Sequence, residues 1–336
     1  MKKLSLFDKV IYTINGLLAS ILLLSYFLRY ISPKTLPVFV VLSTFIPLLI
    51  IINIIFVFYW LIKLKKQLLL SSLVLIIGFF FSTPLFKISS KTSALNNDLK
   101  VMSYNVKSFD LFIKKDSKGK ELNGFEFIKV KDPDILVVQE FYKSKKVNIS
   151  FPYKYIRLWP KNHKYGMAIY SKYKIINSGS FDLKNTVNNI IFADIVKDKD
   201  TIRIYGTHLE SLGIRPHEEN FGQKNSEKLL RRVTNSFKKQ AEQTELFLAH
   251  EKEWKGKKIV CGDFNNTAYS WVYNQISRNK KDAFINAGKG FGKSFDYPFP
   301  MRIDFILTDN TATINQFKTY TEKYSDHYPI MARINW

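Results

Sequence analysis

Three long apolar runs fill the first 86 residues of the chain, and no comparable run follows them. They cover residues 10–28, 36–62 and 67–86, and none contains a charged side chain. A helix needs about 20 mostly apolar residues to cross the hydrocarbon core of a bilayer. Lys2 and Lys3 ahead of the first run also suit a signal peptide, but two further runs and the lack of a cleavage pattern argue against one. We therefore predict a membrane anchor of three transmembrane helices.

Basic residues flank these runs unevenly. Three lysines in residues 2–9 and three in residues 63–66 fall on one side of the membrane, whereas the other side has Arg29 and Lys34 in the first loop and Lys87 and Lys91 after the third run. Cytoplasmic loops carry an excess of Lys and Arg. The bias predicts an integral multi-pass membrane protein with its N-terminus inside and its large C-terminal part outside the cytoplasm.

The remainder of the chain has the pattern of a folded α/β domain. Residues 87–98 are small and polar, which predicts a linker between an anchor over residues 1–86 and a domain over residues 99–336. Helical stretches lie between some of the short strand-like stretches, and the clearest apolar pattern at helical spacing is in residues 226–254. The strand-like stretches are residues 99–106, 134–140, 165–171, 189–197, 201–209, 257–265, 302–309 and 329–336. Many strands with few helices favour sheets that pack together.

Charge changes this picture by indicating a class of partner. Lys and Arg number 51 against 28 Asp and Glu, for a formal charge of +23. Eight of the basic residues and one acidic residue lie in residues 1–86, so about +16 belongs to the rest. An excess of this size favours nucleic acid, phospholipid headgroups or another phosphate ester. Solubility and retention at the membrane explain it equally well. The single cysteine, Cys261, excludes an intramolecular disulfide.

Polar side chains stand at the ends of the strand-like stretches, where apolar residues run directly up to them. A carboxylate rarely follows a buried run unless it is paired or binds a metal. One such residue alone is typical of a turn or a cap, but this pattern repeats on six strands, and a sheet gathers its strand ends at one edge. The residues are Asn105, Gln139, Glu140, His208, Asp263, Asn265, Asp304, Asp326 and His327.

This set of side chains restricts the chemistry. It has no Ser or Cys nucleophile beside a base, and the histidines lack the HExxH spacing of a zinc site. Carboxylate and amide oxygens suit Mg²⁺ or Mn²⁺. A histidine can then orient a water molecule, and a second can stabilise charge or protonate a leaving oxygen. These are the requirements of phosphate-ester hydrolysis.

The order of the motifs resembles that of the endonuclease/exonuclease/phosphatase superfamily. "SYNV", "QE", "THL", "GDFN", "RID" and "SDH" follow one another across residues 99–336. The resemblance implies a four-layer α/β/β/α sandwich, here preceded by the three predicted transmembrane helices. "THLES" and "YSDHYPI" look closer to the deoxyribonuclease and sphingomyelinase branches, and the whole arrangement resembles membrane-anchored bacterial members. Lys107 stands where the abasic-site branch has an acidic residue, which argues against that branch.

The resemblance also implies the metal ligands and the residues around the attacked phosphate. Glu140 is the expected principal ligand, with Asn105 beside it, and Asp326 helps with the metal or with hydrogen bonds. Asp263 and Asn265 are expected to position the attacking water and the phosphate, and Asp263 is itself the base in some interpretations of the family.

Two histidines complete the implied catalytic set. His327 is expected to act as general base or to polarise the phosphate, with Asp304 holding its imidazole. His208 resembles the histidine that stabilises the pentavalent phosphate or protonates the leaving group. The reaction is in-line attack by water, in which positioning and electrostatics supply most of the catalysis.

Two functions remain open at this stage. The first is a membrane-anchored, divalent-metal-dependent phosphodiesterase acting on nucleic acid or on a phospholipid headgroup. A lipid substrate predicts apolar side chains beside the site, and residues 295–300, "FDYPFP", either supply them or form an ordinary loop. The second is an inactive, membrane-anchored binding protein for anionic phosphate ligands, which the complete set of expected catalytic residues disfavours. No protein partner can be inferred.

Overall fold

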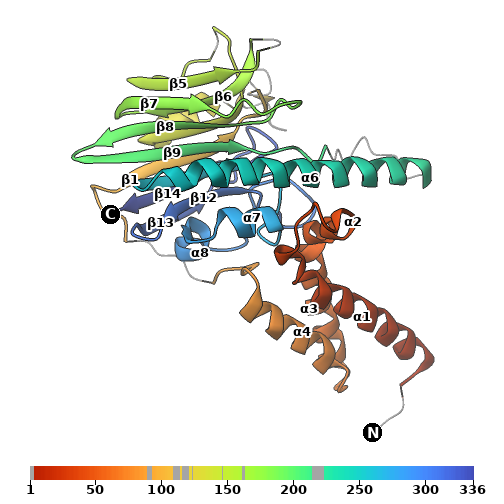
Figure 1. Ribbon diagram of the computed structural model, residues 1–336. Coiled ribbons are helices and arrows are strands. Elements are labelled where there is room, and N and C mark those ends of the chain that lie inside the picture. The colour runs from red at the N-terminus through yellow and green to blue at the C-terminus, as the bar shows by residue number, and fades with distance from the viewer. Residues whose placement is uncertain are drawn as a thin grey trace.

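The computed structural model describes most of the chain and shows an α/β sandwich with a helical extension at the N-terminus (Figure 1). The residues that it describes are 4–88, 93–108, 114–115, 121–122, 124–145, 147–160, 163–213 and 223–336. Lys2, Lys3 and Lys91, which contributed to the predicted orientation, lie outside these ranges, as does the middle of the predicted linker.

Two six-stranded sheets form the centre of the described domain. The first has the order β13 (Thr313–Thr319), β14 (Ile330–Asn335), β1 (Leu99–Asn105), β4 (Ile135–Tyr142), β6 (Tyr165–Ser171) and β5 (Tyr153–Leu158). The second has the order β11 (Lys280–Asp282), β12 (Asp304–Asp309), β10 (Lys257–Asp263), β9 (Asp200–His208), β8 (Asn189–Lys197) and β7 (Lys174–Ser180). The pairs β1–β4 and β9–β10 are parallel, and the other neighbours within these sheets are antiparallel. A short hairpin pairs β2 (Lys114–Lys115) with β3 (Glu121–Leu122).

Alternation along the strands divides the apolar residues into three layers. Val101, Val137, Ile204 and Cys261 belong to the cluster that fills the space between the two sheets. The outer face of the first sheet packs against α5 (Gly124–Lys131). The outer face of the second sheet packs against α6 (Gln223–Glu253) and α7 (Trp271–Ile276), and the short α8 (Ala283–Ala287) contributes to the central layer. The predicted sandwich and the long helix are therefore confirmed, and Cys261 is buried between the sheets.

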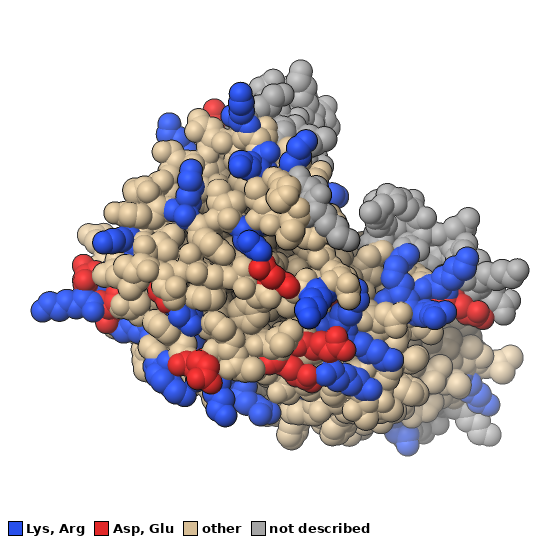
Figure 2. All heavy atoms as spheres, turned by 45° about the horizontal axis from the view of Figure 1, so that its top comes forward, with Lys and Arg blue, Asp and Glu red and all other residues tan. Residues whose placement is uncertain are grey.

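Basic residues are dispersed over the face of the molecule that Figure 2 shows, with Asp and Glu beside several of them. Ion pairs such as Arg157 with Asp182 and Lys257 with Asp200 account for part of this pattern. Paired charges of this kind contribute little to stability.

The N-terminal extension contains α1 (Leu6–Ser25), α3 (Ile46–Ile62) and α4 (Leu68–Phe81). Two of its helical segments, Leu6–Tyr30 and Pro37–Ile62, are long and apolar enough to cross a membrane. The third predicted span is only partly met, because α4 has 14 residues and a helix rises about 1.5 Å per residue against a core of about 30 Å. The structure thus shows two candidate spans and one shorter apolar helix.

The segment between α1 and α3 packs on the sandwich. It contains η1 (Leu28–Tyr30), α2 (Pro37–Val40) and η2 (Val41–Phe45). Val40 is buried against Val233 and Phe237 of α6. The beginning of the second predicted span therefore contacts the folded domain, which the apolar sequence alone did not reveal.

Candidate active site

The polar strand ends lie on the same side of their strands as the central core. In β9, the alternate residues Ile202 and Ile204 are core residues and His208 continues their row. In β10, Asp263 lies two residues after the core residue Cys261 and therefore on the same face of the strand. Asp263 pairs with His208 in β9 and with Asp304 in β12. Since alternate side chains share a face of a sheet, these three residues form one row where the apolar layer ends.

Asn105 joins this row to the other sheet. It ends β1 at the same parity as the core residues of that strand and is 1% exposed. Its Nδ2 donates to Asp263 Oδ2 at 3.0 Å and to Glu140 Oε1 at 3.1 Å. The two carboxylates, which belong to different sheets, therefore approach one amide group.

Glu140 reaches the site through an irregularity of its strand. β4 continues to Tyr142, and its register with β6 shifts between Val138 and Phe141. Glu140 has φ +51°, a left-handed conformation that is uncommon for a residue with a side chain. In a regular strand Glu140 would share the outer face with Val138, but the bulge turns its carboxylate to the inner edge. Gln139 stays inside, where its Nε2 donates to Ser103 Oγ at 3.3 Å.

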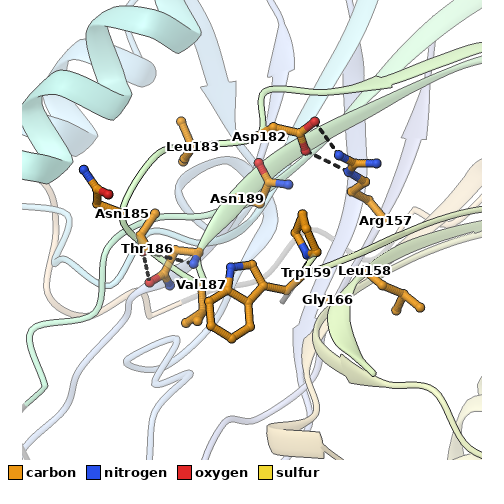
Figure 3. A pocket seen from close by; sticks show the side chains of 12 residues that line it. Arg157, Leu158, Trp159, Gly166, Asp182, Leu183, Asn185, Thr186, Val187 and Asn189 are labelled. Carbon is orange, nitrogen blue, oxygen red and sulfur yellow. Dashed lines mark hydrogen bonds and ion pairs between the residues drawn. The ribbon is translucent and has the colours of Figure 1, made fainter. Parts of the chain in front are cut away.

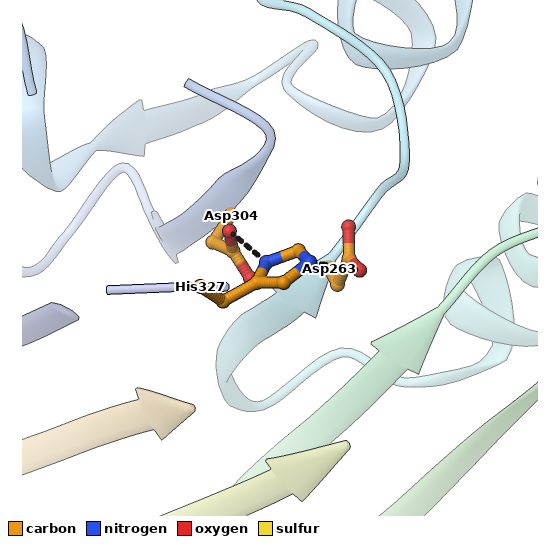
Figure 4. Close-up of side chains that lie close together, drawn as sticks. All are labelled: Asp263, Asp304 and His327. Carbon is orange, nitrogen blue, oxygen red and sulfur yellow. Dashed lines mark hydrogen bonds and ion pairs between the residues drawn. The ribbon is translucent and has the colours of Figure 1, made fainter. Parts of the chain in front are cut away.

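His327 lies between two carboxylates (Figure 4). Its Nδ1 is 2.9 Å from Asp304 Oδ2, and its Nε2 is 3.6 Å from Asp263 Oδ2. Burial lowers the pKa of His327, but Asp304 and Asp263 outweigh burial and raise this pKa to about 10. Burial raises the pKa of Asp263 to about 7, although His327 opposes the shift. The two acidic residues and the imidazole each offer an atom within 4.8 Å of the others.

The pKa of His208 shifts in the opposite direction to that of His327. The Nε2 of His208 lies 3.8 Å from both Glu140 Oε1 and Asp263 Oδ2, too far for a hydrogen bond. Burial lowers the pKa of His208, against the attraction of Glu140. The site therefore combines an imidazole that favours its neutral form with one that favours its protonated form.

The two remaining predicted residues lie on loops. Asn265 has φ +49°, its N–H donates to Asp263 Oδ1 at 2.7 Å, and its Nδ2 donates to the carbonyl of Leu209 at 2.9 Å. Asp326 accepts from Lys107 Nζ at 2.7 Å, and its side chain is 35% exposed. Burial raises the pKa of Asp326, but His327 and Lys107 outweigh it, so this pKa is lowered. Asp326 thus lies at the rim with a cationic partner.

The prediction missed the segment that supports the "RID" and "SDH" motifs. Ser294 Oγ accepts the backbone N–H of Asp304 at 3.0 Å, and the Ser294 carbonyl accepts the N–H of Tyr328 at 2.7 Å. The Phe295 ring packs on His327 with centroids 4.9 Å apart. The proximity of "GFGKSF" to "MRID" in the chain was the only available signal. Phe295, the first residue of the segment 295–300, therefore contacts the candidate site directly.

The donor set suits a divalent metal. Glu140 and Asp263 offer carboxylates on either side of Asn105, and a buried carboxylate whose pKa is raised gains from a nearby cation. The second possible group, Asp263 with Asp304 and His327, already contains the close contact between Asp304 and the imidazole. Oxygen donors of this kind favour hard cations.

A two-sheet sandwich with carboxylates and histidines gathered at one edge suits the hydrolysis of a phosphoric ester. The family model described as "Endonuclease/Exonuclease/phosphatase family" matches residues 102–327. The chain belongs to that family. A second model, a domain of unknown function, matches residues 8–85.

Solved structures share the fold at low sequence identity. TDP2 from D. rerio complexed with a single strand DNA product is 16% identical, covers 72% of this chain and 100% of its own, and has a TM-score of 0.51. TDP2 from C. elegans is 15% identical over 72% of this chain and 76% of its own, with a TM-score of 0.50. A mannosyl-6-phosphatase from Bacteroides thetaiotaomicron VPI-5482 is 14% identical over 71% of this chain and 100% of its own, with a TM-score of 0.48. None of the curated proteins compared with the chain matches it.

Proposed function

We propose that the protein is a membrane-anchored phosphodiesterase that uses Mg²⁺ or Mn²⁺ to hydrolyse a phosphoric ester of nucleic acid or of a phospholipid headgroup. The proposal divides the chain into an anchor (residues 1–86), a linker (87–98) and a catalytic domain (99–336). The observation that carries it is the position of Asp263, which neighbours His208, Asp304, His327, Asn105 and, through Asn105, Glu140.

Glu140 and Asn105 are the proposed metal ligands. Asp326, which precedes His327 in the chain, is proposed to assist them in binding the metal. When bound, the cation would neutralise charge on the phosphate and lower the pKa of coordinated water. Lys107 now pairs with Asp326, so this carboxylate has to leave its partner before it can bind a metal. Glu140 is a stronger candidate ligand than Asp326, because Asn105 holds the Glu140 carboxylate close to that of Asp263.

Asp263 and Asn265 are proposed to hold the attacking water in line with the leaving oxygen. Asp263 Oδ1 accepts the Asn265 N–H, which fixes the orientation of the carboxylate. A buried carboxylate that binds a proton near neutrality is suited to act as general base. His327 has its Nδ1 beside Asp304 and favours its protonated form, so Asp263 is the better candidate to take the proton from water.

His327 is then available to polarise the phosphate. Asp304 occupies its Nδ1 side, so that Nε2 is the nitrogen that can donate to a phosphate oxygen. His208 lies on the other side of Asp263 and is proposed to stabilise the pentavalent phosphate or to protonate the leaving group. This arrangement supplies preorganised donors in a buried site, where electrostatic stabilisation is strongest.

Membrane anchoring is supported by the distribution of polar groups in the helical extension. Asn15, Asn53 and Ser71 are completely buried and hydrogen-bonded to one another or to Trp60, at 2.6–2.9 Å, across α1, α3 and α4. Large apolar side chains such as that of Phe58 are exposed instead. Polar contacts inside and apolar side chains outside are what a bilayer favours. The lysine bias supports an extracytoplasmic catalytic domain.

The test uses the full chain in detergent micelles. With Mg²⁺, the wild type is offered bis-p-nitrophenyl phosphate, single-stranded DNA, RNA, sphingomyelin and phosphatidylinositol phosphates, with EDTA as the metal-free control. We expect hydrolysis that EDTA and His327→Ala abolish and that His163→Asn, a substitution of an exposed histidine, leaves intact. No hydrolysis of any ester by the wild type would refute the proposal, and retained phosphate binding would then favour the inactive binding protein.

A further inference from the structure

We propose that the active site lies at the surface of the bilayer that holds the anchor, and that its substrate is a phosphodiester lipid of that same bilayer. This inference rests on the proposed function and selects the phospholipid from its two substrate classes. Water attacks the phosphorus, one P–O bond breaks and the leaving oxygen gains a proton, so the lipid yields an alcohol and a phosphate monoester. Contacts between the helical extension and the catalytic residues support this placement.

The loop of residues 263–270 connects the proposed base to the candidate membrane spans. Asp263 begins this loop, and Tyr269 packs in the same cluster as Leu22 of α1 and Ile46 of α3. Because a chain extends by at most about 3.6 Å per residue, the Cα atoms of Asp263 and Tyr269 are at most about 22 Å apart. A phosphate at Asp263 is therefore close to the ends of helices that would stand in the bilayer.

A second connection runs through residues 290–300, which we call the bridging segment. Lys87, which follows the third apolar helix, exchanges two backbone hydrogen bonds with Gly290, each at 2.8 Å. The rings of Phe86 and Phe291 pack edge to face with their centroids 4.9 Å apart. The chain that leaves the anchor is thus paired with the beginning of the bridging segment.

The rest of the bridging segment lies between the anchor and the site. Phe295 packs on His327 with ring centroids 4.9 Å apart. Pro300, at the end of the segment, lines a cavity of about 20 Å³ whose wall includes Pro47 of α3 and Pro84. A cavity of this volume holds about one water molecule, so the segment packs closely against the anchor. The contacts of His327 therefore continue to the membrane end of the molecule.

Apolar side chains are exposed along the same connection. Soluble surfaces rarely expose large apolar patches, whereas aromatic side chains are enriched where a membrane meets water. Lys289, an exposed residue beside the bridging segment, adds a charge that anionic headgroups attract. The headgroup layer of a bilayer would cover these side chains. They are 42–84% exposed and belong to Phe79, Phe80, Phe81, Phe86, Ile88 and Phe291.

A cavity of about 480 Å³ next to the site is less suited to a nucleic acid strand. Its wall residue Asn189 pairs with His208 across β8 and β9. The charged residues of its wall already bind each other, because Arg157 donates to both oxygens of Asp182 at 2.7 and 2.5 Å (Figure 3). A nucleic acid backbone is bound mainly through Lys and Arg. The bordering strands β5 and β7 also lie at the opposite end of the molecule from α1, α3 and α4 (Figure 1).

The test reconstitutes the full chain with Mg²⁺ in vesicles of phosphatidylethanolamine, phosphatidylglycerol and sphingomyelin, each labelled in turn. The labelled lipid is placed either in the vesicles that hold the protein or in separate vesicles without protein. We expect hydrolysis in the first case and a rate about 10²-fold lower in the second, because a shared bilayer gives the substrate a high effective concentration.

Three outcomes of this comparison would overturn the inference. The first is equal hydrolysis of the lipid in the two kinds of vesicle. The second is faster cleavage of single-stranded DNA than of any lipid in the vesicles that hold the protein. The third is cleavage of bis-p-nitrophenyl phosphate with no cleavage of lipid, which would leave the proposed hydrolysis of phosphoric esters intact.

Substitution of exposed residues tests the membrane surface itself. Phe291→Ser should lower the rate for vesicle lipid, relative to that for bis-p-nitrophenyl phosphate, by about 10-fold, as expected for the loss of a buried phenyl group. Ile88→Ser, at an 84% exposed position that adds little to the fold, should act in the same direction. Tyr153→Ser is the matched control, because Tyr153 of β5 is an aromatic residue with 40% exposure. An unchanged ratio in both Phe291→Ser and Ile88→Ser would contradict the inference.

A depth measurement keeps the inference testable if no ester is cleaved. Cys261 is the single cysteine and is buried, so a nitroxide can be attached selectively to Phe291→Cys or Tyr153→Cys. In electron paramagnetic resonance, the label at residue 291 should be accessible to oxygen and shielded from a water-soluble nickel complex, and the label at residue 153 should show the reverse. Equal accessibility at the two positions would overturn the inference. Absence of all hydrolysis with the first label inside the bilayer would instead contradict the proposed function alone.

Discussion

Replacement of Tyr269 by alanine tests whether the anchor supports the active site. Tyr269 lies in the proposed catalytic loop (residues 263–270), is 4% exposed, and packs in the cluster that contains Leu22 of α1, Ile46 of α3 and Val74 of α4. Two hydrogen bonds flank this contact: Thr267 Oγ1 donates to the Ser43 carbonyl at 3.1 Å, and Thr83 Oγ1 donates to the Ala268 carbonyl at 3.2 Å. The helices thus contact the segment that begins with the proposed base.

The size of the effect follows from the burial of the ring. Truncation of a buried large aromatic side chain to alanine costs about 3–5 kcal/mol, and in Tyr269→Ala this loss falls on the contact between helices and catalytic loop. The loop has a second support in Gln240, whose Oε1 accepts from Asn266 Nδ2 at 2.8 Å, so we expect displacement of the loop without unfolding. A shift of about 1 Å at a catalytic group can cost about 10²-fold in rate. We therefore expect kcat to fall by about 10- to 100-fold with little change in KM.

The assay is steady-state hydrolysis of bis-p-nitrophenyl phosphate by the full chain in detergent, with thermal unfolding measured in parallel. Tyr269→Phe, which retains the ring, should stay close to the wild type in both measurements. Lys34→Ala removes a half-exposed ion pair with Glu245 elsewhere on the contact and should have little effect. Wild-type kcat in Tyr269→Ala, together with a lower midpoint of unfolding, would refute a catalytic role for the anchor contact.

Three further changes test the site and the fold. Asp304→Asn should lower kcat by roughly 10³–10⁴-fold, as in triads that lose the carboxylate partner of histidine, and NMR titration should show the pKa of His327 falling from about 10; an unchanged pKa would contradict the pairing. Mg²⁺ at 100 times its Kd should stabilise the wild type by about 2.7 kcal/mol, and Glu140→Gln should lose most of this gain in thermal unfolding; equal stabilisation would exclude Glu140 as a main ligand. Burial, with help from Arg203, lowers the pKa of His250 below 6.5 in the folded state, so the unfolded state binds more protons below that pH. Acidification from pH 7.5 to 5.5 should therefore lower the free energy of unfolding more in the wild type than in His250→Gln, as measured with urea; equal slopes would contradict the shift.

Sequence pattern by itself determined the class of fold and most of the candidate site. Alternation in the strand-like stretches predicted packed sheets, and the polar residues that end those stretches predicted one cluster at an edge. Asp263, His208 and Asp304 lie at that edge because each continues the inward-facing row of its own strand. The face of a strand on which a side chain lies follows from its position in the alternating pattern. It can therefore be predicted without knowing which strands pair.

Tertiary structure decided the features that depend on neighbours. The bulge at Glu140 requires the register between β4 and β6, and the hydrogen bond from Asn105 to Asp263 joins residues 158 positions apart. The pairing of Asp326 with Lys107, the contact of the α1–α3 segment with α6 and the short α4 have the same origin. Backbone torsions at such positions, and the ends of helices, are set by long-range packing that overrides local preference. A pattern of apolar and polar residues specifies which face a side chain takes, but only the assembled sheets specify what it meets there.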